Sequence, residues 1–315
     1  DYSIQISKLF YERFIKDEDI TLFSPHETPG LYEAFGMPEF DEMYEMYERK
    51  TSINKKKIRA QELFMNLLKE RAETGRIYIM NIDHCNTHSS FKDKVYMSNL
   101  CQEITLPTTP VQHIDDENGE IALCILSAVN LGLIRDKDDL EELCDLSVRA
   151  LDEIIDYQEY PILAAKQSAQ SRRSLGIGYI GLAHYLAKNH VAYGDKEALE
   201  LVDETTEAFQ YYLLKASNQL AIEKGQCEYF EKTKYSDGIL PIDTYKKDID
   251  KIVKRKLSYD WKQLRKDIQE HGLRHSTLSA QMPSESSSVV SNATNGIEPP
   301  RDYLSVKKSK KGTLK

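Results

Sequence analysis

Two stretches decide the fold class: Lys57-Ile58-Arg59-Ala60-Gln61-Glu62-Leu63-Phe64-Met65-Asn66-Leu67-Leu68 and, after Gly75, Arg76-Ile77-Tyr78-Ile79-Met80-Asn81-Ile82. Apolar residues recur every three or four positions in the first, which predicts an amphipathic helix over 56–73 that ends at Gly75. The second is rich in β-branched and aromatic residues, which predicts a strand. The same reasoning predicts helices at 3–16, 138–157, 197–224 and 262–271. Helices with strands scattered between them indicate the α/β class.

The composition excludes several classes of protein. The chain has 315 residues, of which 40% are hydrophobic and 30% charged, as in soluble globular domains. Its formal net charge of −9 argues against a nucleic-acid coat protein, but it leaves room for a small basic pocket that binds one phosphorylated substrate. No run approaches the roughly 18 apolar residues of a membrane helix. We therefore expect no membrane partner and no nucleic-acid partner.

The first residues and the cysteines add two expectations. Asp1-Tyr2-Ser3-Ile4 contains neither a signal peptide nor an initiator Met, so we expect a segment of a longer protein or one half of a split one. The five cysteines are an odd number without a Cys-x-x-Cys pair, which favours a reducing cytosol over a secreted disulfide scaffold. A cysteine that matters here is expected to serve chemistry.

The first candidate site lies in Ser98-Asn99-Leu100-Cys101-Gln102-Glu103-Ile104. If this segment is extended, Asn99, Cys101 and Glu103 face one side, each about 7 Å from the next. An amide, a thiol and a carboxylate would then be able to bind a hydroxyl, react and accept a proton. The alternative from spacing alone is a half-buried strand with a core cysteine.

Two further segments carry candidate groups. Cys124 lies in an apolar run and is either a core thiol or half of a redox pair with Cys85, Cys101 or a cysteine outside the chain. The cluster Pro283-Ser284-Glu285-Ser286-Ser287-Ser288 is either a solvated loop or a phosphate site made of hydroxyls and backbone N–H groups.

Three other motifs have simpler interpretations. Gly176-Ile177-Gly178-Tyr179-Ile180-Gly181 matches a dinucleotide fingerprint but lacks a preceding strand, so its glycines are expected to allow close backbone packing. His84-Cys85-Asn86-Thr87-His88 has no second ligand cluster, so we predict a loop and no metal site. In Tyr211-Tyr212, within a predicted helix, one ring is expected in the core and the other at the surface.

Five ordered motifs together resemble one family, the large catalytic subunit of class I ribonucleotide reductase. They are Asn81-Ile82-Asp83-His84-Cys85-Asn86-Thr87-His88, Ser98-Asn99-Leu100-Cys101-Gln102-Glu103, Asn118-Gly119-Glu120-Ile121-Ala122-Leu123-Cys124, Arg172-Arg173-Ser174-Leu175-Gly176-Ile177-Gly178 and Met282-Pro283-Ser284-Glu285-Ser286-Ser287, the last followed by Ser291-Asn292-Ala293-Thr294-Asn295-Gly296-Ile297-Glu298-Pro299-Pro300-Arg301. The resemblance implies that 1–315 is a catalytic segment of a helix-rich, ten-stranded α/β barrel, with the reactive cysteine on an internal finger loop. The nucleotide-sensing N-terminal region and the C-terminal tail of the family fall outside it.

The resemblance also implies roles for individual residues. Cys101 is the position of a thiyl radical that removes the ribose 3′-hydrogen, Glu103 is the base on the 3′-hydroxyl, and Asn99 hydrogen-bonds the ribose. Cys124 is one of two cysteines that reduce the 2′ position and become a disulfide. The implied substrate-binding residues are Asn99, Leu100, Cys101, Gln102, Glu103, Pro283, Ser284, Glu285, Ser286 and Ser287.

The implied activity is the reduction of ribonucleoside diphosphates to deoxyribonucleotides. No cofactor is expected to bind this chain directly, because a metal-containing small subunit supplies the radical and a thioredoxin- or glutaredoxin-type protein supplies electrons. A homodimer of the full large subunit, allosteric regulation by ATP and a cytoplasmic location are also implied. The alternative is a non-catalytic half of a split or truncated reductase that acts only with a complementing chain.

Overall fold

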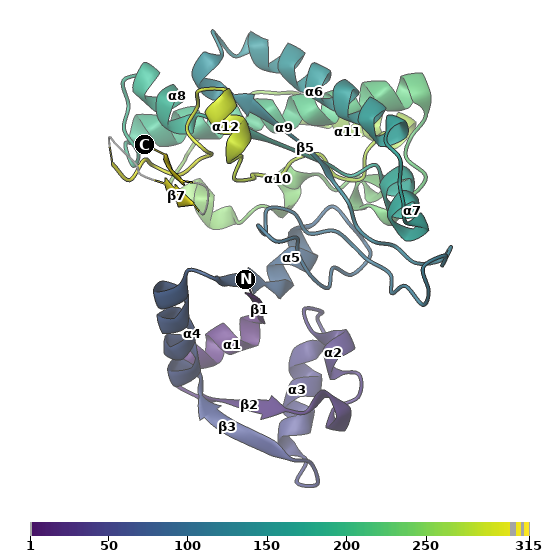
Figure 1. Ribbon diagram of the computed structural model, residues 1–315, viewed down its shortest axis with the longest axis vertical. Helices are drawn as coiled ribbons and strands as arrows, with labels where there is room; N and C mark the ends of the chain where they lie inside the picture. The colour runs from purple at the N-terminus through teal and green to yellow at the C-terminus, as the bar shows by residue number, and fades with distance from the viewer. Residues whose placement is uncertain (1, 303–306, 310–311, 315) are drawn as a thin grey trace. The chain divides into compact units, whose positions relative to one another are not determined.

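A computed structural model describes residues 2–302, 307–309 and 312–314 (Figure 1). The chain divides into two compact units, Asp1–Thr108 and Thr109–Lys315. Each unit has its own hydrophobic core. Among the residues that the structure describes, no helix is both long and apolar enough to cross a bilayer.

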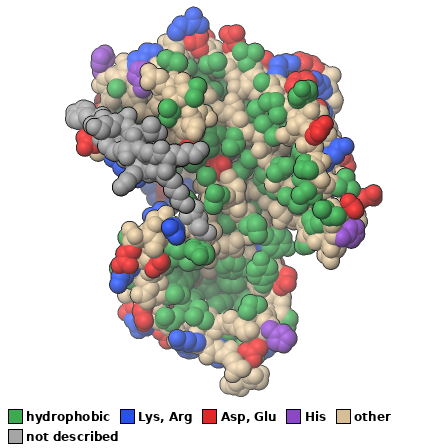
Figure 2. Space-filling view, in the orientation of Figure 1, with side chains coloured by type: hydrophobic (Ala, Val, Ile, Leu, Met, Phe, Trp, Pro, Cys, Tyr) green, Lys and Arg blue, Asp and Glu red, His purple; other side chains and the backbone are tan. Residues whose placement is uncertain are grey.

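The first unit combines two small sheets with helices. Its elements are β1 (Tyr2–Ile6), α1 (Lys8–Ile15), β2 (Asp19–Phe23), η1 (Pro25–Glu27), α2 (Leu31–Ala34), α3 (Phe40–Arg49), β3 (Lys55–Arg59), α4 (Ala60–Thr74), β4 (Ile77–Asn81) and α5 (Ile82–His88). β1 pairs with β4 in parallel, and β2 pairs with β3 antiparallel. Hydrophobic side chains of this unit, among them Phe10, Phe40 and Phe64, line a pocket of about 280 Å³ (Figure 2).

Two of the predicted helices in this unit begin later than expected. The prediction of a helix over 3–16 is wrong at its start, because β1 takes those residues and Ser7 caps α1 by accepting the Phe10 N–H at 3.3 Å. The helix predicted over 56–73 likewise begins only at Ala60, since the preceding residues pair with β2. The predicted strand at β4 is confirmed, and α4 ends as predicted at Gly75, which has φ 66°.

The second unit contains a parallel strand pair and the long helices. Its elements are β5 (Ile125–Asn130), η2 (Leu131–Leu133), α6 (Asp138–Tyr157), α7 (Leu163–Arg172), β6 (Leu175–Ile180), α8 (Leu182–Lys188), α9 (Lys196–Lys224), η3 (Phe230–Lys232), η4 (Lys234–Asp237), α10 (Pro241–Thr244), η5 (Lys247–Lys251), α11 (Trp261–His271), α12 (Ser286–Val290), β7 (Lys307–Ser309) and β8 (Gly312–Leu314). The helices predicted at α6, α9 and α11 are confirmed to within one residue at each end.

The core of the second unit lies where α6 and α9 pack together. Val148 and Leu151 of α6 and Leu213 of α9 are buried in it. Acidic residues fill the first turn of α6, where they favour the positive end of the helix dipole. The adjacent tyrosines Tyr211 and Tyr212 are both half-buried, so the expectation of one core ring and one surface ring is wrong. Both rings instead pack against Tyr259: Tyr211 stacks on it at 4.7 Å between centroids, and Tyr212 meets it edge-on at 5.3 Å.

A third backbone segment runs beside β6. The Leu175 N–H donates to Thr277 at 3.1 Å, the Ala280 N–H donates to Ile177 at 3.1 Å, and Ile177 bridges Ser279 in parallel. β5, which pairs with β6 in parallel, lies on the other side. The backbones can approach because a Cβ on Gly178 would lie 2.4 Å from the Ala280 carbonyl oxygen. The expectation that these glycines allow close packing is therefore confirmed.

The named strands of the described residues form two-stranded sheets and no closed barrel. The α/β class is confirmed, with helices covering the strand pairs (Figure 1). The serine cluster follows the third segment, at the end where β5 and β6 also finish. This is the edge of parallel strands at which α/β proteins commonly bind ligands.

Candidate active site

Residues 98–104 of the first unit form a closed loop and not an extended strand. The Gln102 N–H donates to the Asn99 carbonyl at 3.2 Å, and Gln102 has φ 59°. The Ser98 hydroxyl and the Ile104 N–H donate to the Asn99 side chain at 3.2 and 3.4 Å. The prediction that Asn99, Cys101 and Glu103 share one face of a strand is therefore wrong. The Asn99 side chain accepts a backbone N–H that would otherwise be free to pair with a neighbouring strand.

The loop presents its middle residues outward. Asn99, Leu100 and Cys101 are exposed, with Leu100 66% accessible. The Gln102 side-chain amide is turned toward β1, where it donates to the Ser3 hydroxyl. A thiol at the bend of a hydrogen-bonded loop is held in place by its neighbours and can meet a reactant.

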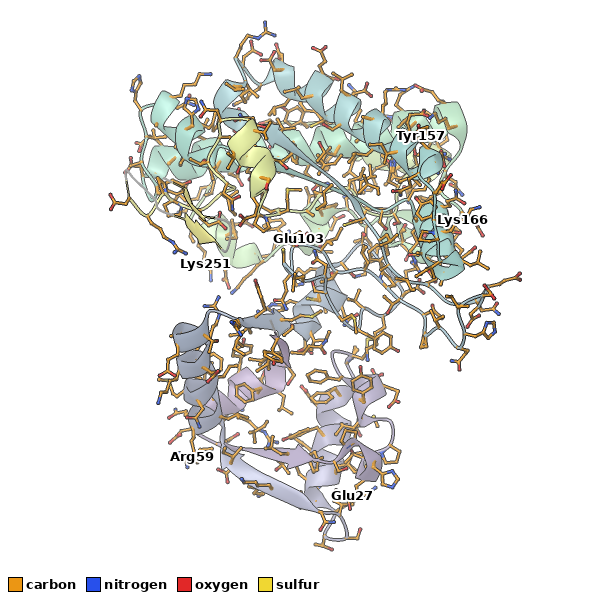
Figure 3. All side chains as sticks on the ribbon, in the orientation of Figure 1. Glu27, Arg59, Glu103, Tyr157, Lys166 and Lys251 are labelled. Carbon is orange, nitrogen blue, oxygen red and sulfur yellow. The ribbon has the colours of Figure 1, made fainter. Side chains whose placement is uncertain are left out.

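Glu103 carries the most unusual group of this loop (Figure 3). Its Oε2 atom is buried and has no hydrogen-bond partner among the described residues. Buried carboxylate oxygens are normally paired, and an unpaired one needs an explanation. It is available to accept a hydrogen bond from a hydroxyl or an N–H of a bound molecule.

Cys124 is half-buried and lies one residue before β5. Its Sγ is 3.8 Å from the position that a Cβ on Gly176 would take. The segment before it is anchored by a buried ion pair, in which Arg172 Nε donates to Glu120 at 2.6 Å. The strand that follows Cys124 is held by β6. The backbone is thus held in place both before and after Cys124. The Cys124 side chain is not a member of the main core cluster of the second unit.

The serine cluster divides into an outward-facing part and an inward-facing part. Ser286 and Ser287 are exposed, and within the described part of the chain their hydroxyls bond to no other protein group. Ser288 is 3% exposed, and its hydroxyl donates to the Glu285 carbonyl at 2.6 Å. The N–H of Ser287 donates within the loop, to Ser284 at 3.0 Å. The hydroxyls of Ser286 and Ser287 are therefore groups that this loop can offer to a ligand.

The predicted residues are assembled in two groups. Asn99, Cys101 and Glu103 belong to the first unit, whereas Cys124 and the serine loop belong to the second. Sequence reasoning missed Asn295, whose side chain holds the serine loop at Glu285. The only available signal was its place in the Asn292-Ala293-Thr294-Asn295-Gly296 run, which carries no chemistry by itself.

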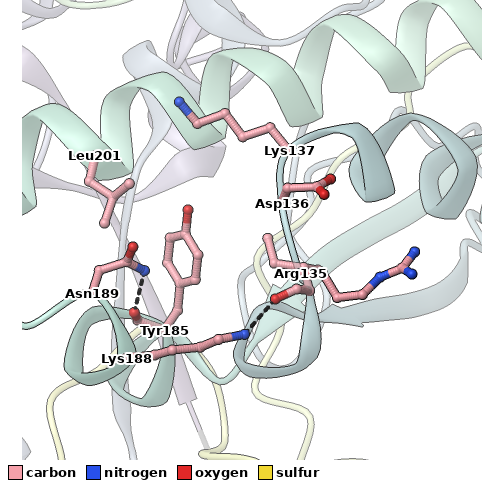
Figure 4. A pocket seen from close by; sticks show the side chains of 8 residues that line it. Arg135, Asp136, Lys137, Tyr185, Lys188, Asn189 and Leu201 are labelled. Atoms are coloured by element: carbon pink, nitrogen blue, oxygen red, sulfur yellow. Dashed lines mark hydrogen bonds between the residues drawn. The ribbon is translucent and has the colours of Figure 1, made fainter.

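A charged pocket of about 370 Å³ lies elsewhere in the second unit (Figure 4). Its basic groups are already occupied: Lys188 Nζ donates to the Ile134 carbonyl at 2.6 Å, Lys137 pairs with Glu204, and Arg135 pairs with Asp139. None of the predicted site residues lines it. Among the described residues there is also no cluster of three or more His, Cys, Asp or Glu side chains suited to a metal ion. The segment of His84 and His88, predicted as a loop, is the short helix α5.

Comparison with known proteins agrees with the motifs. The family model for the ribonucleotide reductase barrel domain matches residues 1–315. The chain is 61% identical to the ribonucleoside-diphosphate reductase subunit alpha of Haemophilus influenzae, 59% to ribonucleoside-diphosphate reductase 1 subunit alpha of Escherichia coli, and 48% to subunit alpha of Enterobacteria phage T4. Each match covers 100% of this chain and 42% of the relative, so the chain spans less than half the length of these relatives. The chain belongs to the ribonucleotide reductase family and matches that family's barrel domain over its whole length.

Proposed function

We propose that this chain carries the catalytic centre of a ribonucleoside-diphosphate reductase, which converts ribonucleoside diphosphates into 2′-deoxyribonucleoside diphosphates for DNA synthesis. The names of its relatives support the activity. The observation that carries the proposal is the exposed Cys101 thiol in a closed loop, two residues from the buried and unpartnered Glu103 oxygen. The Cys101 sulfur could react with a C–H bond of a substrate, while the Glu103 oxygen accepts a hydrogen bond from a hydroxyl on the same carbon.

The proposed reaction uses these groups in sequence. The Cys101 sulfur, as a thiyl radical, takes the 3′-hydrogen atom, while Glu103 accepts the 3′-hydroxyl proton and Asn99 hydrogen-bonds the ribose. The 2′-hydroxyl then leaves as water, with its proton supplied by a thiol. Cys124 and a second cysteine, proposed to lie outside this chain, give two electrons, one proton to the departing hydroxyl and one hydrogen to C2′, and become a disulfide. Cys101 then returns the hydrogen to C3′, and Glu103 returns its proton to the 3′-oxygen. The balance is one dithiol oxidised for each ribose reduced.

The diphosphate is proposed to bind at the serine loop. Pro283 leads the chain from the segment beside β6 into the loop, where Ser286 and Ser287 are exposed and Ser284 is half-buried. Hydroxyl donors with no protein partner suit phosphate oxygens. Glu285 contributes through its backbone position in the turn.

The proposal includes partners that act from outside this chain. A metal-containing small subunit supplies the oxidising equivalent, and a thioredoxin- or glutaredoxin-type dithiol restores the reduced cysteines. The relatives are named as alpha subunits, which supports a second kind of subunit. We also propose that the complete large subunit forms a homodimer, that ATP and other nucleotides regulate it, and that it is located in the cytoplasm.

The role of Cys101 is tested in the complete large subunit, assembled with its small subunit and a dithiol. Cys101→Ser should abolish product formation and leave substrate affinity nearly unchanged, because the hydroxyl cannot carry the radical. Cys85, a half-buried free thiol on α5, provides the matched control, and Cys85→Ser should keep its activity. Turnover by the Cys101→Ser enzyme would refute the assignment.

The role of the serines is tested by replacing Ser286 and Ser287 with Ala in the same enzyme. Each hydroxyl is proposed to donate one hydrogen bond to a charged phosphate oxygen. Loss of both hydroxyls should therefore raise KM roughly tenfold or more, with a smaller effect on kcat. Ser236→Ala, which removes a hydroxyl from the 3-10 helix η4 of the second unit, is the control and should leave KM unchanged. An unchanged KM in the double variant would contradict the phosphate site.

A further inference from the structure

The serine loop contains one residue in a conformation that it rarely adopts. Ser284–Ser287 form a β-turn, closed by the Ser287 N–H on the Ser284 carbonyl at 3.0 Å. Glu285 occupies the second position of this turn with φ 45° and ψ −110°. That region suits glycine, because a Cβ crowds the backbone there. Other groups must therefore hold Glu285 in place.

Asn295 supplies the main contact. Its Oδ1 accepts the Glu285 N–H at 2.5 Å, and its backbone carbonyl accepts the Ser284 N–H at 3.2 Å. From the other side, the buried Ser288 hydroxyl donates to the Glu285 carbonyl at 2.6 Å and lies 3.4 Å from the same Oδ1. The peptide groups on both sides of Glu285 are thus fixed by hydrogen bonds.

The Asn295 segment is itself attached to rigid structure. The Thr294 carbonyl accepts the Gly181 N–H at 3.0 Å, and the Gly296 carbonyl accepts the Leu182 N–H at 3.4 Å. Gly181 directly follows β6 and precedes α8. Through Asn295, the serine turn is therefore anchored to the end of a core strand.

We infer that Asn295 is a positioning residue that holds the Ser284–Ser287 turn in the shape that presents Ser286 and Ser287 to a nucleoside diphosphate. The inference rests on the proposed function and adds a residue to it. Asn295 acts through the backbone of Glu285, because its side-chain oxygen is engaged there. Its loss should weaken substrate binding and leave the radical chemistry at Cys101 unaffected.

The first test measures KM and kcat for a ribonucleoside diphosphate with the complete enzyme. Asn295→Ala should raise KM about tenfold, with kcat within about twofold of wild type, because the side-chain hydrogen bond that holds Glu285 in its positive-φ conformation is lost. Asn189→Ala is the matched control. That asparagine also bonds to the backbone, from its Nδ2 to the Tyr185 carbonyl at 2.8 Å, but it lies at the end of α8 and should not alter KM.

The second test is a double-variant cycle with Glu285→Gly. Glycine adopts the positive φ without help, so adding Asn295→Ala to Glu285→Gly should change KM by less than about twofold. If Asn295→Ala fails to fold, Asn295→Asp replaces it, since Asp keeps the acceptor oxygen. The added negative charge beside the diphosphate should raise KM, and this increase in KM should become smaller as the salt concentration rises. A tenfold effect in both backgrounds would overturn the inference alone. A wild-type enzyme that binds no nucleoside diphosphate would overturn the proposed function as well.

Discussion

His275 is a fully buried histidine among charged groups from several elements. The Ser217 hydroxyl is 2.9 Å from its Nδ1, and Asp152 lies 3.2 Å from its Nε2. Arg173 and Arg274 bind the same carboxylate. Burial lowers the pKa of His275 to about 4 despite the Asp152 charge. Burial alone would raise the pKa of Asp152, but His275 and the arginines hold it below its usual range.

This arrangement predicts a loss of stability in mild acid. The unfolded chain binds a proton at His275 near pH 6.5, whereas the folded chain binds it only near pH 4. The free energy of unfolding should therefore fall between these values, by up to about 3 kcal/mol. Denaturant unfolding followed by Trp261, the one tryptophan of the chain, measures it. His275→Gln should flatten the pH dependence, whereas the exposed His113→Gln should not. A His275→Gln curve as steep as wild type would refute this.

The candidate residues show how far side-chain type alone predicts a site. Asn99, Cys101 and Glu103 can be selected from their chemistry, but their local conformation cannot. Asn99 bonds to Ile104 through its own side chain, and this contact becomes visible only in three dimensions. Asn295 was not predictable at all, because its role depends on the backbone angle of Glu285.

At the scale of elements, β6 depends on glycine for its packing. A Cβ on Gly178 would lie 2.4 Å from a backbone oxygen, which cannot move aside as a flexible side chain could. Gly178→Ala should therefore destabilise the second unit by about 3 kcal/mol. Gly194→Ala is the control, since a Cβ there meets nothing within 4 Å and only its φ of 90° is unfavourable. It should cost about 1 kcal/mol. Equal losses in the two variants would contradict this account of the strand.

The long helices and β4 were predictable, whereas the short strands β1 and β3 were not, for a physical reason. α6 and α9 show their apolar period over many turns, so the pattern is unambiguous. β1 and β3 are short, and a helix begins within two residues of the end of each, so the apolar spacing of the helix continues back into the strand. What makes them strands is pairing with β4 and β2, which lie far away in sequence.

At the scale of the whole molecule, the family is the most predictable property. Five motifs in the right order led to the reductase family, and the match over residues 1–315 confirms it. The division into Asp1–Thr108 and Thr109–Lys315 was not expected, because no change of composition marks the boundary. The motif residues are divided between these two units, with Asn99, Cys101 and Glu103 in the first and Cys124 and the serine loop in the second.

The central claim is that the Cys101 sulfur removes the hydrogen from C3′ of the substrate ribose. The most direct measurement is turnover of a ribonucleoside diphosphate carrying deuterium at C3′, by the complete enzyme. Removal and return of this atom predict slower turnover than with hydrogen, and a deoxyribonucleotide product that still carries deuterium at C3′. Equal rates for the two substrates, together with complete loss of the label to water, would contradict the account.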